Sequence, residues 1–521
     1  MGQCWCREFP PEDVYEPPGG SVGTSSGAIH HHKCSPRAVD PAVVDRLVLE
    51  LLTLIATYVD NDEESPVSLV KLHVIADKEE GWFQVVSSLV HAIPLEDPLG
   101  PSAITIVFDD CPLPSKETVI KLVQLFGLCA QRAILEDINV RVERNLCVVL
   151  GCIGDKLAGP KSSAVLNEGT LEYLLTFLKA RREPCIVLFA LIALEKFSNT
   201  TENKLTIIKR LKEEAVHPLL ALEDMADTDD YTWRQVKFCA TWALDNLFDV
   251  DDRPLSYETV DMKCIHAILN CRDVSEYLKI SADGLEARCD SYSFESVRCT
   301  YQMNSGCWYY ECKIVTPGVM QIGWATKSSH FLNHEGYGIG DDLCSLSYDG
   351  CRKLIWHEAK PYAVTEVPCW QPGDIVGCLL DMDAREAIFS LNGVRLKPST
   401  ELFETTREGF FAAASFMAFQ QCRFNFGSER FVFPPTDREF SAFNDHGLLT
   451  DEEKKVVPRK VYLQRLRCSS IREGCCNLCY DEDAACVIEP CMHRGFCSLC
   501  TAQLALCPLC RGVILNIRVE A

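Results

Sequence analysis

Apolar residues recur at three- and four-residue steps along the first half of the chain, which is the period of an amphipathic helix. Asp40-Pro41 precedes the first of these stretches and reads as an N-cap followed by proline in the first turn. The apolar positions of that stretch are Val43, Val44, Leu47, Val48, Leu51, Leu52 and Ile55. The same period predicts helices over Val67 to Ala76, Trp82 to Ile93 and Lys116 to Leu128, with a proline-rich break from Pro94 to Pro101.

A weak internal repeat appears from about residue 141. Segments 148–157, 188–197 and 238–247 can be overlaid, with spacings of 40 and then about 50 residues. Such spacing is typical of armadillo or HEAT-type helical repeats, and a non-repetitive helical bundle is the alternative. Either arrangement makes residues 40–280 an all-α region that serves as a scaffold and carries no recognisable catalytic motif.

Near residue 280 the hydrophobic period changes from helical to two. Trp308, Tyr310, Cys312 and Ile314 alternate with their neighbours, and Met320, Ile322 and Trp324 repeat the pattern after a turn at Pro317-Gly318. We expect the aromatic residues of this set to lie in the core because they share the inward-facing period.

Further short strands follow at regular intervals. Asp374 to Leu380 is a continuous apolar run, and Ala387 to Leu391 leads into Asn392-Gly393, a strong hairpin signal. Phe410-Phe411 and the alternating Cys422, Phe424 and Phe426 complete the series. The pattern predicts an antiparallel β-sandwich over residues 285–435.

Four phrases in this region resemble successive strands and loops of a SPRY domain over roughly residues 290–430. They are GCWYYECKIVTPGVMQIGWAT, GYGIGDDLCSLSYDG, PGDIVGCLLDMDAREAIFSLNG and FFAAASFMAFQQCRFNFG. The resemblance implies a protein-recognition module whose loops bind a protein substrate on a rigid sandwich. Asp341, Asp342 and Asp349 match no EF-hand spacing, so we interpret them as turn residues.

Residues 436–473 are predicted to be a linker with helices. Thr450 and Glu453 have the spacing of a capping box, and Pro458 then interrupts the chain. Arg459 to Ile471 predicts a short basic helix with a solvated face.

The last segment, residues 474–521, carries paired cysteines and one histidine at short fixed spacings. The pairs are Cys476-x2-Cys479, Cys491-x-His493, Cys497-x2-Cys500 and Cys507-x2-Cys510. Eight soft ligands are enough for two closed tetrahedral zinc shells, so we expect two structural Zn²⁺ ions. A disulfide knot is the alternative, but it does not account for a histidine in a fixed position. Cys475 and Cys486 are surplus to the two shells.

The order of three cysteines, one histidine and four cysteines resembles a RING finger. The resemblance implies that the first and third pairs share one ion and the second and fourth pairs the other. It also implies a ubiquitin ligase that binds a ubiquitin-conjugating enzyme carrying thioester-linked ubiquitin, with no covalent intermediate on the ligase. In such modules Leu478 and Pro508 would contact the conjugating enzyme, and Arg511 would position ubiquitin. The apolar tail of Val513, Ile514, Leu515 and Ile517 resembles that of RING fingers that form homodimers.

Net charge and cysteine usage indicate which partners and which cellular compartment to expect. The formal net charge of −23 over 521 residues disfavours nucleic-acid binding. The chain has thirty cysteines, and most of those outside the last segment stand singly in apolar runs, as buried side chains in a reducing compartment do. Examples are Cys147, Cys152, Cys185, Cys239 and Cys378.

The sequence predicts neither a membrane-spanning run nor a signal peptide, so we expect a cytoplasmic protein. Residues 1–39 are rich in proline, glycine and serine and are predicted to be a flexible leader. Gly2 is a candidate for myristoylation, with Cys4 or Cys6 as a second acyl site, although Cys6 stands where the consensus has Ser or Thr. Membrane association is expected only if this acylation occurs.

Helical region, SPRY and C-terminal RING in this order resemble the RING finger and SPRY domain-containing protein family. The resemblance implies a ubiquitin ligase that selects substrates through its SPRY domain. The alternative is a non-catalytic scaffold whose zinc module only docks partners or dimerises. Neither a phosphate-binding loop nor a hydrolase motif is present in the sequence.

Overall fold

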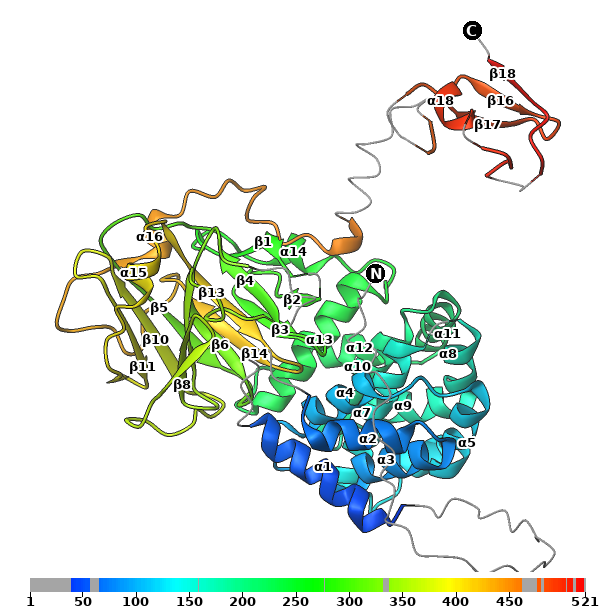
Figure 1. Cartoon of the computed structure of the whole chain (residues 1–521), viewed down its shortest axis with the longest axis horizontal. Helices are drawn as coiled ribbons and strands as arrows, with labels where there is room; N and C mark the ends of the chain where they lie inside the picture. The colour runs from blue at the N-terminus through cyan, green and yellow to red at the C-terminus, as the bar shows by residue number, and fades with distance from the viewer. Residues whose placement is uncertain are drawn as a thin grey trace, which may run out of the picture. The chain divides into compact units, whose positions relative to one another are not determined.

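The computed structural model describes residues 39–56, 65–157, 159–275, 277–330, 337–461, 476–478, 482–502, 504–508 and 512–519. The chain divides into two compact units, Met1–Lys454 and Lys455–Ala521 (Figure 1). The predicted flexible leader, except Val39, lies outside the described residues. In the parts of the chain that are described, every helix is too short or too polar to cross a bilayer.

Helices form the described chain up to Thr259, as the three- and four-residue spacing predicts. The helices are α1 (Pro41–Ile55), α2 (Val67–Ala76), α3 (Glu79–Ala92), α4 (Gly100–Asp110), α5 (Lys116–Phe126), α6 (Ala130–Ala133), α7 (Val140–Lys156), α8 (Pro160–Val165), α9 (Glu168–Ala180), α10 (Pro184–Phe197), α11 (Thr201–Lys212), α12 (Pro218–Glu223), α13 (Tyr231–Asn246) and α14 (Ser256–Thr259).

The ends of these helices follow local capping rules. The Asp40 side chain accepts a hydrogen bond from the Ala42 backbone N–H, which is the predicted N-cap of α1. Helix α4 begins inside the proline-rich stretch that the sequence indicated only as a break. Pro101 lies in its first turn, where backbone N–H groups have no partner within the helix, so proline costs no helical hydrogen bond there.

The three segments that can be overlaid in the sequence fall on α7, α10 and α13. Helix α10 packs against both α7 and α13. Glycine permits a close approach between the first two, since a Cβ at Gly154 would lie 3.0 Å from the backbone nitrogen of Phe197. The equivalent helices therefore stack on one another, as helical repeats do.

Two antiparallel sheets form the sandwich. Its strands are β1 (Leu269–Val274), β2 (Leu278–Ile280), β3 (Glu286–Cys289), β4 (Glu295–Cys299), β5 (Cys307–Ile314), β6 (Met320–Thr326), β7 (Ser345–Asp349), β8 (Leu354–His357), β9 (Lys360–Ala363), β10 (Ile375–Asp381), β11 (Glu386–Leu391), β12 (Val394–Arg395), β13 (Phe410–Phe416), β14 (Gln421–Asn425) and β15 (Ser441–Ala442). One sheet has the order β1-β4-β13-β6-β7-β8-β9 and the other β12-β11-β10-β5-β14-β3-β2, with β15 parallel to β5. The short helix α15 (Leu402–Thr405) lies between β12 and β13, and α16 (Phe443–His446) follows β15.

Strand structure begins at Leu269, earlier than the change of period near residue 280 suggests. Strand β1 is a sheet edge with an irregular register, and most of its side chains are only half-buried. Its apolar alternation is therefore weak, because alternation appears in sequence only where one face is buried. Strand β2 pairs with β3 and also precedes residue 285.

The predicted core and hairpin of the sandwich are confirmed. Trp308, Tyr310 and Trp324 are all buried. At the β11–β12 hairpin, Asn392 and Gly393 have φ of 49° and 80°, and Leu391 pairs with Val394. The Pro317-Gly318 turn joins β5 to β6, which belong to different sheets, so this turn moves the chain across the sandwich.

The three aspartates of the turn interpretation accept backbone hydrogen bonds. Asp341 accepts from the Gly338 N–H, Asp342 from the Cys344 N–H, and Asp349 from the N–H groups of Cys351 and Arg352. Each carboxylate therefore closes a local turn.

The helical region and the sandwich share one hydrophobic core. Val319, Met417 and Phe419 of the sandwich loops belong to the same buried cluster as the side chains of the helices. The Phe189 and Phe419 rings meet edge to face at 5.1 Å, and Ser102 Oγ donates to the Ala418 carbonyl at 3.0 Å. Figure 1 shows α10 and α13 beside the end of the sandwich that carries β3 and β14.

Charged groups are also buried at this interface. The ammonium of Lys279 lies 2.5 Å from a Glu195 oxygen and 2.6 Å from an Asp290 oxygen. Arg288 pairs with the same Asp290 at 2.8 Å and donates to Gln235 on α13 at 2.9 Å. We define these four groups, Lys279, Glu195, Asp290 and Arg288, as the interface charge cluster.

After the sandwich, the reciprocal hydrogen bonds of the predicted capping box are present, but residues 451–454 form a turn and not the expected helix. The Thr450 N–H donates to Glu453 at 2.9 Å, and the Glu453 N–H donates to Thr450 Oγ1 at 3.4 Å. The predicted basic helix over Arg459 to Ile471 lies mostly outside the described residues.

The second unit contains β16 (Cys486–Glu489), β17 (His493–Phe496), α18 (Ser498–Thr501) and β18 (Asn516–Val519). Its sheet has the order β17-β16-β18.

Candidate metal centre and docking face

The second unit brings six of the eight predicted metal ligands into the described structure. These are Cys476, Cys491, His493, Cys497, Cys500 and Cys507. The remaining two ligands, Cys479 and Cys510, lie outside the described residues, as do Arg511 and the acylation candidates Gly2, Cys4 and Cys6.

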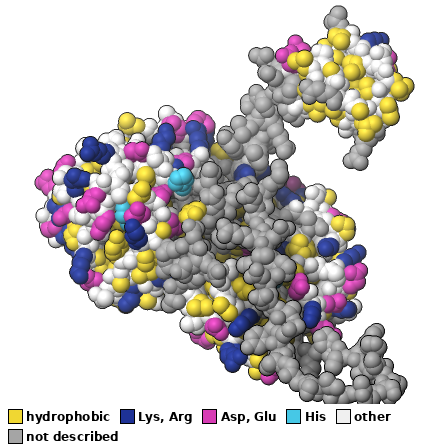
Figure 2. All heavy atoms as spheres, in the orientation of Figure 1, with side chains coloured by type: hydrophobic (Ala, Val, Ile, Leu, Met, Phe, Trp, Pro, Cys, Tyr) yellow, Lys and Arg dark blue, Asp and Glu magenta, His cyan; other side chains and the backbone are white. Residues whose placement is uncertain are grey.

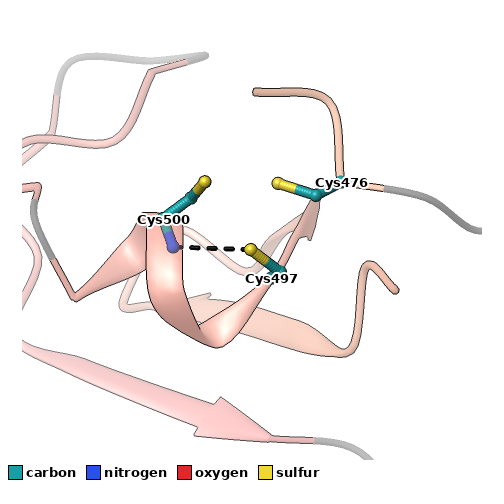
Figure 3. Close-up of side chains that lie close together, drawn as sticks. All are labelled: Cys476, Cys497 and Cys500. Atoms are coloured by element: carbon teal, nitrogen blue, oxygen red, sulfur yellow. Dashed lines mark hydrogen bonds between the residues drawn. The ribbon is translucent and has the colours of Figure 1, made fainter. Parts of the chain in front are cut away.

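Cys476, Cys497 and Cys500 form the first cluster. Their sulfur atoms lie within 4.8 Å of one another and point toward a common centre (Figure 3). In a tetrahedral site, four sulfur atoms that each lie about 2.3 Å from a zinc ion are about 3.8 Å from one another. The three sulfur atoms of this cluster therefore need only a small shift to bind one common ion. Cys497 caps α18, because its sulfur accepts the Cys500 N–H at 3.4 Å. The short helix thus places both ends of the Cys497-x2-Cys500 pair on the same site.

Cys491, His493 and Cys507 form the second cluster. One ligand atom from each residue lies within 4.8 Å of the others, and His493 Nδ1 is 3.5 Å from Cys507 Sγ. Strand β17 begins at His493, and its pairing with β16 holds the histidine at the edge of the small sheet. Sulfur and imidazole nitrogen are the ligands that zinc prefers in structural sites.

Alternate pairs contribute to each cluster. Cys476 of the first pair meets the third pair in one cluster, and Cys507 of the fourth pair meets the second pair in the other. None of the described cysteines forms a disulfide bond, so the geometry favours a metal-binding arrangement over the disulfide alternative. With zinc bound, the sulfur atoms of these residues are thiolates.

Cys486 lies apart from both clusters. It is a buried residue of β16, 1% exposed, with backbone pairing to β17 and β18. Its side chain packs as an apolar group, in keeping with its place outside the ligand spacing.

The predicted docking residues are exposed on the loops that carry the ligands. Leu478 follows Cys476 by two residues and is 43% exposed, and Pro508 directly follows Cys507 and is also exposed. Met492, Leu499 and Leu506 are exposed apolar residues of the same unit that the sequence analysis did not single out. Their positions inside or next to the ligand pairs could have identified them in the sequence as candidate docking residues. Figure 2 shows mainly hydrophobic side chains on the visible face of this unit.

The apolar tail forms part of the sheet. Strand β18 pairs with β16, and the Leu515 N–H donates to the Glu489 carbonyl at 2.9 Å. Ile514 packs against the buried cluster that contains the zinc ligands, whereas Val513, Leu515 and Val519 are each more than 60% exposed. One side of the tail thus stabilises the unit and the other remains an apolar surface.

The isolated cysteines of the first unit have no nucleophilic surroundings. Burial raises the pKa of the Cys239 thiol to about 12 and raises the pKa of Cys147 and Cys378 well above the usual range. These thiols are neutral at physiological pH and make poor nucleophiles. Cys147, Cys152, Cys239 and Cys378 are buried as predicted, and Cys185 is only partly buried.

Comparison with known proteins identifies two segments. The family model of the SPRY domain matches residues 307–429, and that of the C3HC4-type zinc finger (RING finger) matches residues 472–517. The chain therefore contains a SPRY domain and a RING finger, and the RING finger implies that the Cys/His clusters bind zinc.

Two curated proteins share similar segments. The E3 ubiquitin-protein ligase RKP of Arabidopsis thaliana is 35% identical over 144 residues, which are 27% of this chain and 11% of that protein. The ATP-dependent RNA helicase DDX1 of Xenopus laevis is 27% identical over 171 residues, which are 32% of this chain and 22% of that protein. The chain thus spans less than a quarter of either relative.

Solved structures give matches to single domains. The SPRY domain of human HERC1 covers 30% of this chain and 96% of its own, at 18% identity and a TM-score of 0.26. The PSpry domain of TRIM65 covers 31% of this chain and 90% of its own, at 12% identity and the same TM-score of 0.26.

Proposed function

We propose that this chain, which contains a SPRY domain and a RING finger, is a RING-type ubiquitin-protein ligase. The observation that carries the proposal is the construction of the second unit, in which alternate Cys/His pairs meet in two clusters within a RING finger match. The similarity of one segment to the ligase RKP supports the same activity.

We propose that one cysteine from outside the described residues completes each cluster. Cys476, Cys479, Cys497 and Cys500 would hold one zinc ion, and Cys491, His493, Cys507 and Cys510 would hold the second. Two closed shells leave no open coordination position, so the ions stabilise the loops and take no part in bond making. The metal supplies structure, and the loops supply the docking surface.

The reaction follows from positioning. Leu478 and Pro508 bind the conjugating enzyme, and Arg511 holds its thioester-linked ubiquitin in a reactive orientation. A substrate lysine then attacks the thioester carbonyl, the thiol of the conjugating enzyme leaves, and an isopeptide bond forms without an adduct on this chain. Such catalysis acts through proximity and orientation. The SPRY domain recruits the protein substrate.

Replacing Leu478 by alanine is expected to reduce ubiquitin-chain formation about tenfold or more, because an apolar anchor near the centre of an interface commonly contributes more than 1.4 kcal/mol. The assay combines the full chain with ubiquitin, activating enzyme and a panel of conjugating enzymes. Leu448→Ala is the control, since Leu448 is a leucine that is 92% exposed and lies outside the second unit.

Zinc content measured on the same samples separates loss of docking from loss of fold. Unchanged activity of Leu478→Ala with zinc retained would contradict the Leu478 contact. Inactivity of the wild-type chain across the whole panel would contradict the ligase proposal itself and favour the non-catalytic scaffold.

The apolar tail is proposed to form a homodimer contact. Val513, Leu515 and Val519 present exposed side chains on and beside the edge strand β18. Sedimentation of the full chain tests this: Leu515→Asp is expected to shift the chain toward monomer, and an unchanged mass would contradict the contact.

The N-terminal acylation candidates bear on where the protein is located. We propose a cytoplasmic protein that associates with membranes only if Gly2 is myristoylated and Cys4 or Cys6 carries a second acyl chain. Mass spectrometry of the native N-terminal peptide decides between the acylated and free forms.

A further inference from the structure

Two cysteines of the sandwich lie on loops that are bound to each other. Cys351 lies in the turn between β7 and β8, and Cys369 lies in the connection between β9 and β10. The Trp370 N–H donates to the Gly350 carbonyl at 3.1 Å, so a hydrogen bond joins the neighbour of one cysteine to the neighbour of the other. Neither cysteine forms a disulfide bond in the structure.

The two loops run antiparallel and extend the ladder between β8 and β9. These two strands are antiparallel, and just beyond them the Val364 N–H donates to the Lys353 carbonyl at 2.8 Å. The bond from Trp370 to Gly350 lies further along in the same sense, because residue numbers fall on one loop and rise on the other. The loops therefore bring facing residues together as neighbouring strands do.

Cys351 and Cys369 occupy a closely spaced position of this antiparallel arrangement. Each lies one residue inward from the hydrogen bond between Gly350 and Trp370. In antiparallel chains, the Cα atoms of such a pair are typically about 4.5 Å apart. A disulfide bond joins cysteines whose Cα atoms are about 4.4 to 6.8 Å apart. A bond between the two sulfur atoms is therefore compatible with the path of the backbone.

Trp370 holds the loop that carries Cys369 in place. Its side chain is fully buried, and its indole N–H donates to the carbonyls of Pro317 and Gly318, both at 3.2 Å. The ring also lies against Gly350, where a Cβ would come within 2.3 Å of it. Packing as well as the backbone hydrogen bond therefore keeps the two loops close together.

The two thiols differ in accessibility. Cys369 is exposed, whereas Cys351 is partly buried and packs against the core that the sandwich shares with the helices. Burial raises the pKa of the Cys351 thiol to about 12, with a further rise from Asp349. Cys369 and Asp97 act on this pKa in the same direction, and Arg352 acts against them. A small oxidant therefore reaches Cys369 first, and Cys351 reacts second.

We propose that Cys351 and Cys369 form a redox-reactive pair, which a small disulfide such as oxidised glutathione converts into an intramolecular disulfide bond. The thiolate of Cys369 attacks one sulfur of oxidised glutathione, a reduced glutathione leaves, and a mixed disulfide remains on Cys369. The thiolate of Cys351 then attacks the Cys369 sulfur, and the second glutathione leaves. The chain gives up two protons and two electrons, and oxidised glutathione takes up both.

The disulfide bond closes the β8–β9 hairpin at its base. Strand β9 is an edge of its sheet, and all 4 of its residues are exposed. A crosslink at the base restricts the opening of the hairpin. In a reducing compartment the bond forms when the ratio of oxidised to reduced glutathione rises. The pair gives the sandwich a covalent state that depends on redox conditions, and this holds whether or not the chain is a ubiquitin ligase.

The test equilibrates the full, zinc-loaded chain with mixtures of reduced and oxidised glutathione. Remaining thiols are then blocked, and unreduced peptides are mapped by mass spectrometry. A crosslinked peptide that contains Cys351 and Cys369 is expected to be the main product of this pair where oxidised glutathione predominates, and to disappear on reduction. Amide exchange of the β8–β9 hairpin is expected to slow at least about threefold in the crosslinked chain. Absence of the crosslinked peptide at every ratio would overturn the proposal.

Single substitutions separate the two steps. Cys351→Ser is expected to accumulate at least about tenfold more glutathione on Cys369 than the wild-type chain does, because the second attack is removed. Cys369→Ser is expected to form no crosslink and to leave Cys351 without glutathione. Cys264→Ser is the control, since Cys264 is another exposed cysteine, and it is expected to form the crosslink as the wild-type chain does. Equal amounts of glutathione on Cys369 in the wild-type chain and in Cys351→Ser would contradict the pair.

The pH dependence of the second step identifies the attacking thiol. Closure of the mixed disulfide is expected to become about tenfold faster per pH unit between about pH 7 and 9. The reason is that the thiolate fraction of Cys351 rises tenfold per unit well below its raised pKa. A rate of closure that does not change with pH would exclude Cys351 as the attacking thiol and overturn the proposal.

Discussion

Replacing Lys279 by methionine is expected to lower the free energy of unfolding of the first unit by about 3–5 kcal/mol. The Lys279 side chain is 4% exposed and pairs with the carboxylates of Glu195 and Asp290. Burial acts to lower the pKa of Lys279, but the two carboxylates outweigh it and raise the pKa above its ordinary value. Methionine keeps the volume of the stem and removes the charge, which leaves Glu195 buried without its partner.

Thermal and urea unfolding of the full chain, followed by circular dichroism, measure this loss. Lys121→Met is the matched control, because Lys121 pairs with Glu79 at 2.5 Å but both side chains are more than 40% exposed. An exposed pair contributes at most about 1 kcal/mol. Adding Glu195→Gln to Lys279→Met is expected to restore part of the stability. Equal effects of the buried and exposed substitutions would show that the interface charge cluster does not hold the helical region to the sandwich.

The second large effect concerns the metal centre. Cys497→Ser is expected to lower bound zinc from about two ions per chain to about one or fewer. Structural zinc contributes on the order of 10 kcal/mol to the folding of small metal-bound units, so we expect ubiquitin-chain formation to be lost. Serine preserves a hydrogen-bond acceptor at the N-cap of α18, where the Cys497 sulfur accepts the Cys500 N–H. The substitution therefore removes the soft ligand and keeps the cap.

Metal content by mass spectrometry and the ubiquitination assay give two independent readouts. Cys486→Ala is the control, since Cys486 is a buried cysteine of the same unit outside both clusters. It is expected to retain zinc and activity. Full zinc content in Cys497→Ser would exclude Cys497 as a ligand. Loss of zinc in Cys486→Ala would show that zinc is lost through unfolding of the unit and not through removal of a ligand.

The helical region and the sandwich form one unit with a shared core. The periods of the sequence predict two separate regions, yet Val319 and Phe419 of the sandwich pack among the helices. The sandwich occupies the helical surface that includes Phe189 of α10. A partner of the sandwich must then bind surfaces that the helical region leaves open.

Local features of this protein are determined by the sequence itself. Asp40 caps α1 and Asn392-Gly393 forms a tight hairpin turn, because each depends on the conformational preferences of adjacent residues. Trp308 and Trp324 are buried where the two-residue period places them. The spacing of the terminal Cys/His pairs likewise indicates zinc, since each pair forms half of a tetrahedral shell on its own.

The tertiary structure alone decides which local pieces meet. Lys279 and Glu195 are 84 residues apart in the chain, and no local pattern indicates that a lysine in a short edge strand is buried against a helix. Leu343 and Thr405 are brought together over 62 residues at the open end of the sandwich. Periodicity reports which face of an element is buried, whereas the partner of that face depends on how all the elements pack. For that reason the sequence predicts the metal ligands of the zinc unit. It does not predict which end of the sandwich is covered by the helical region and which end is exposed.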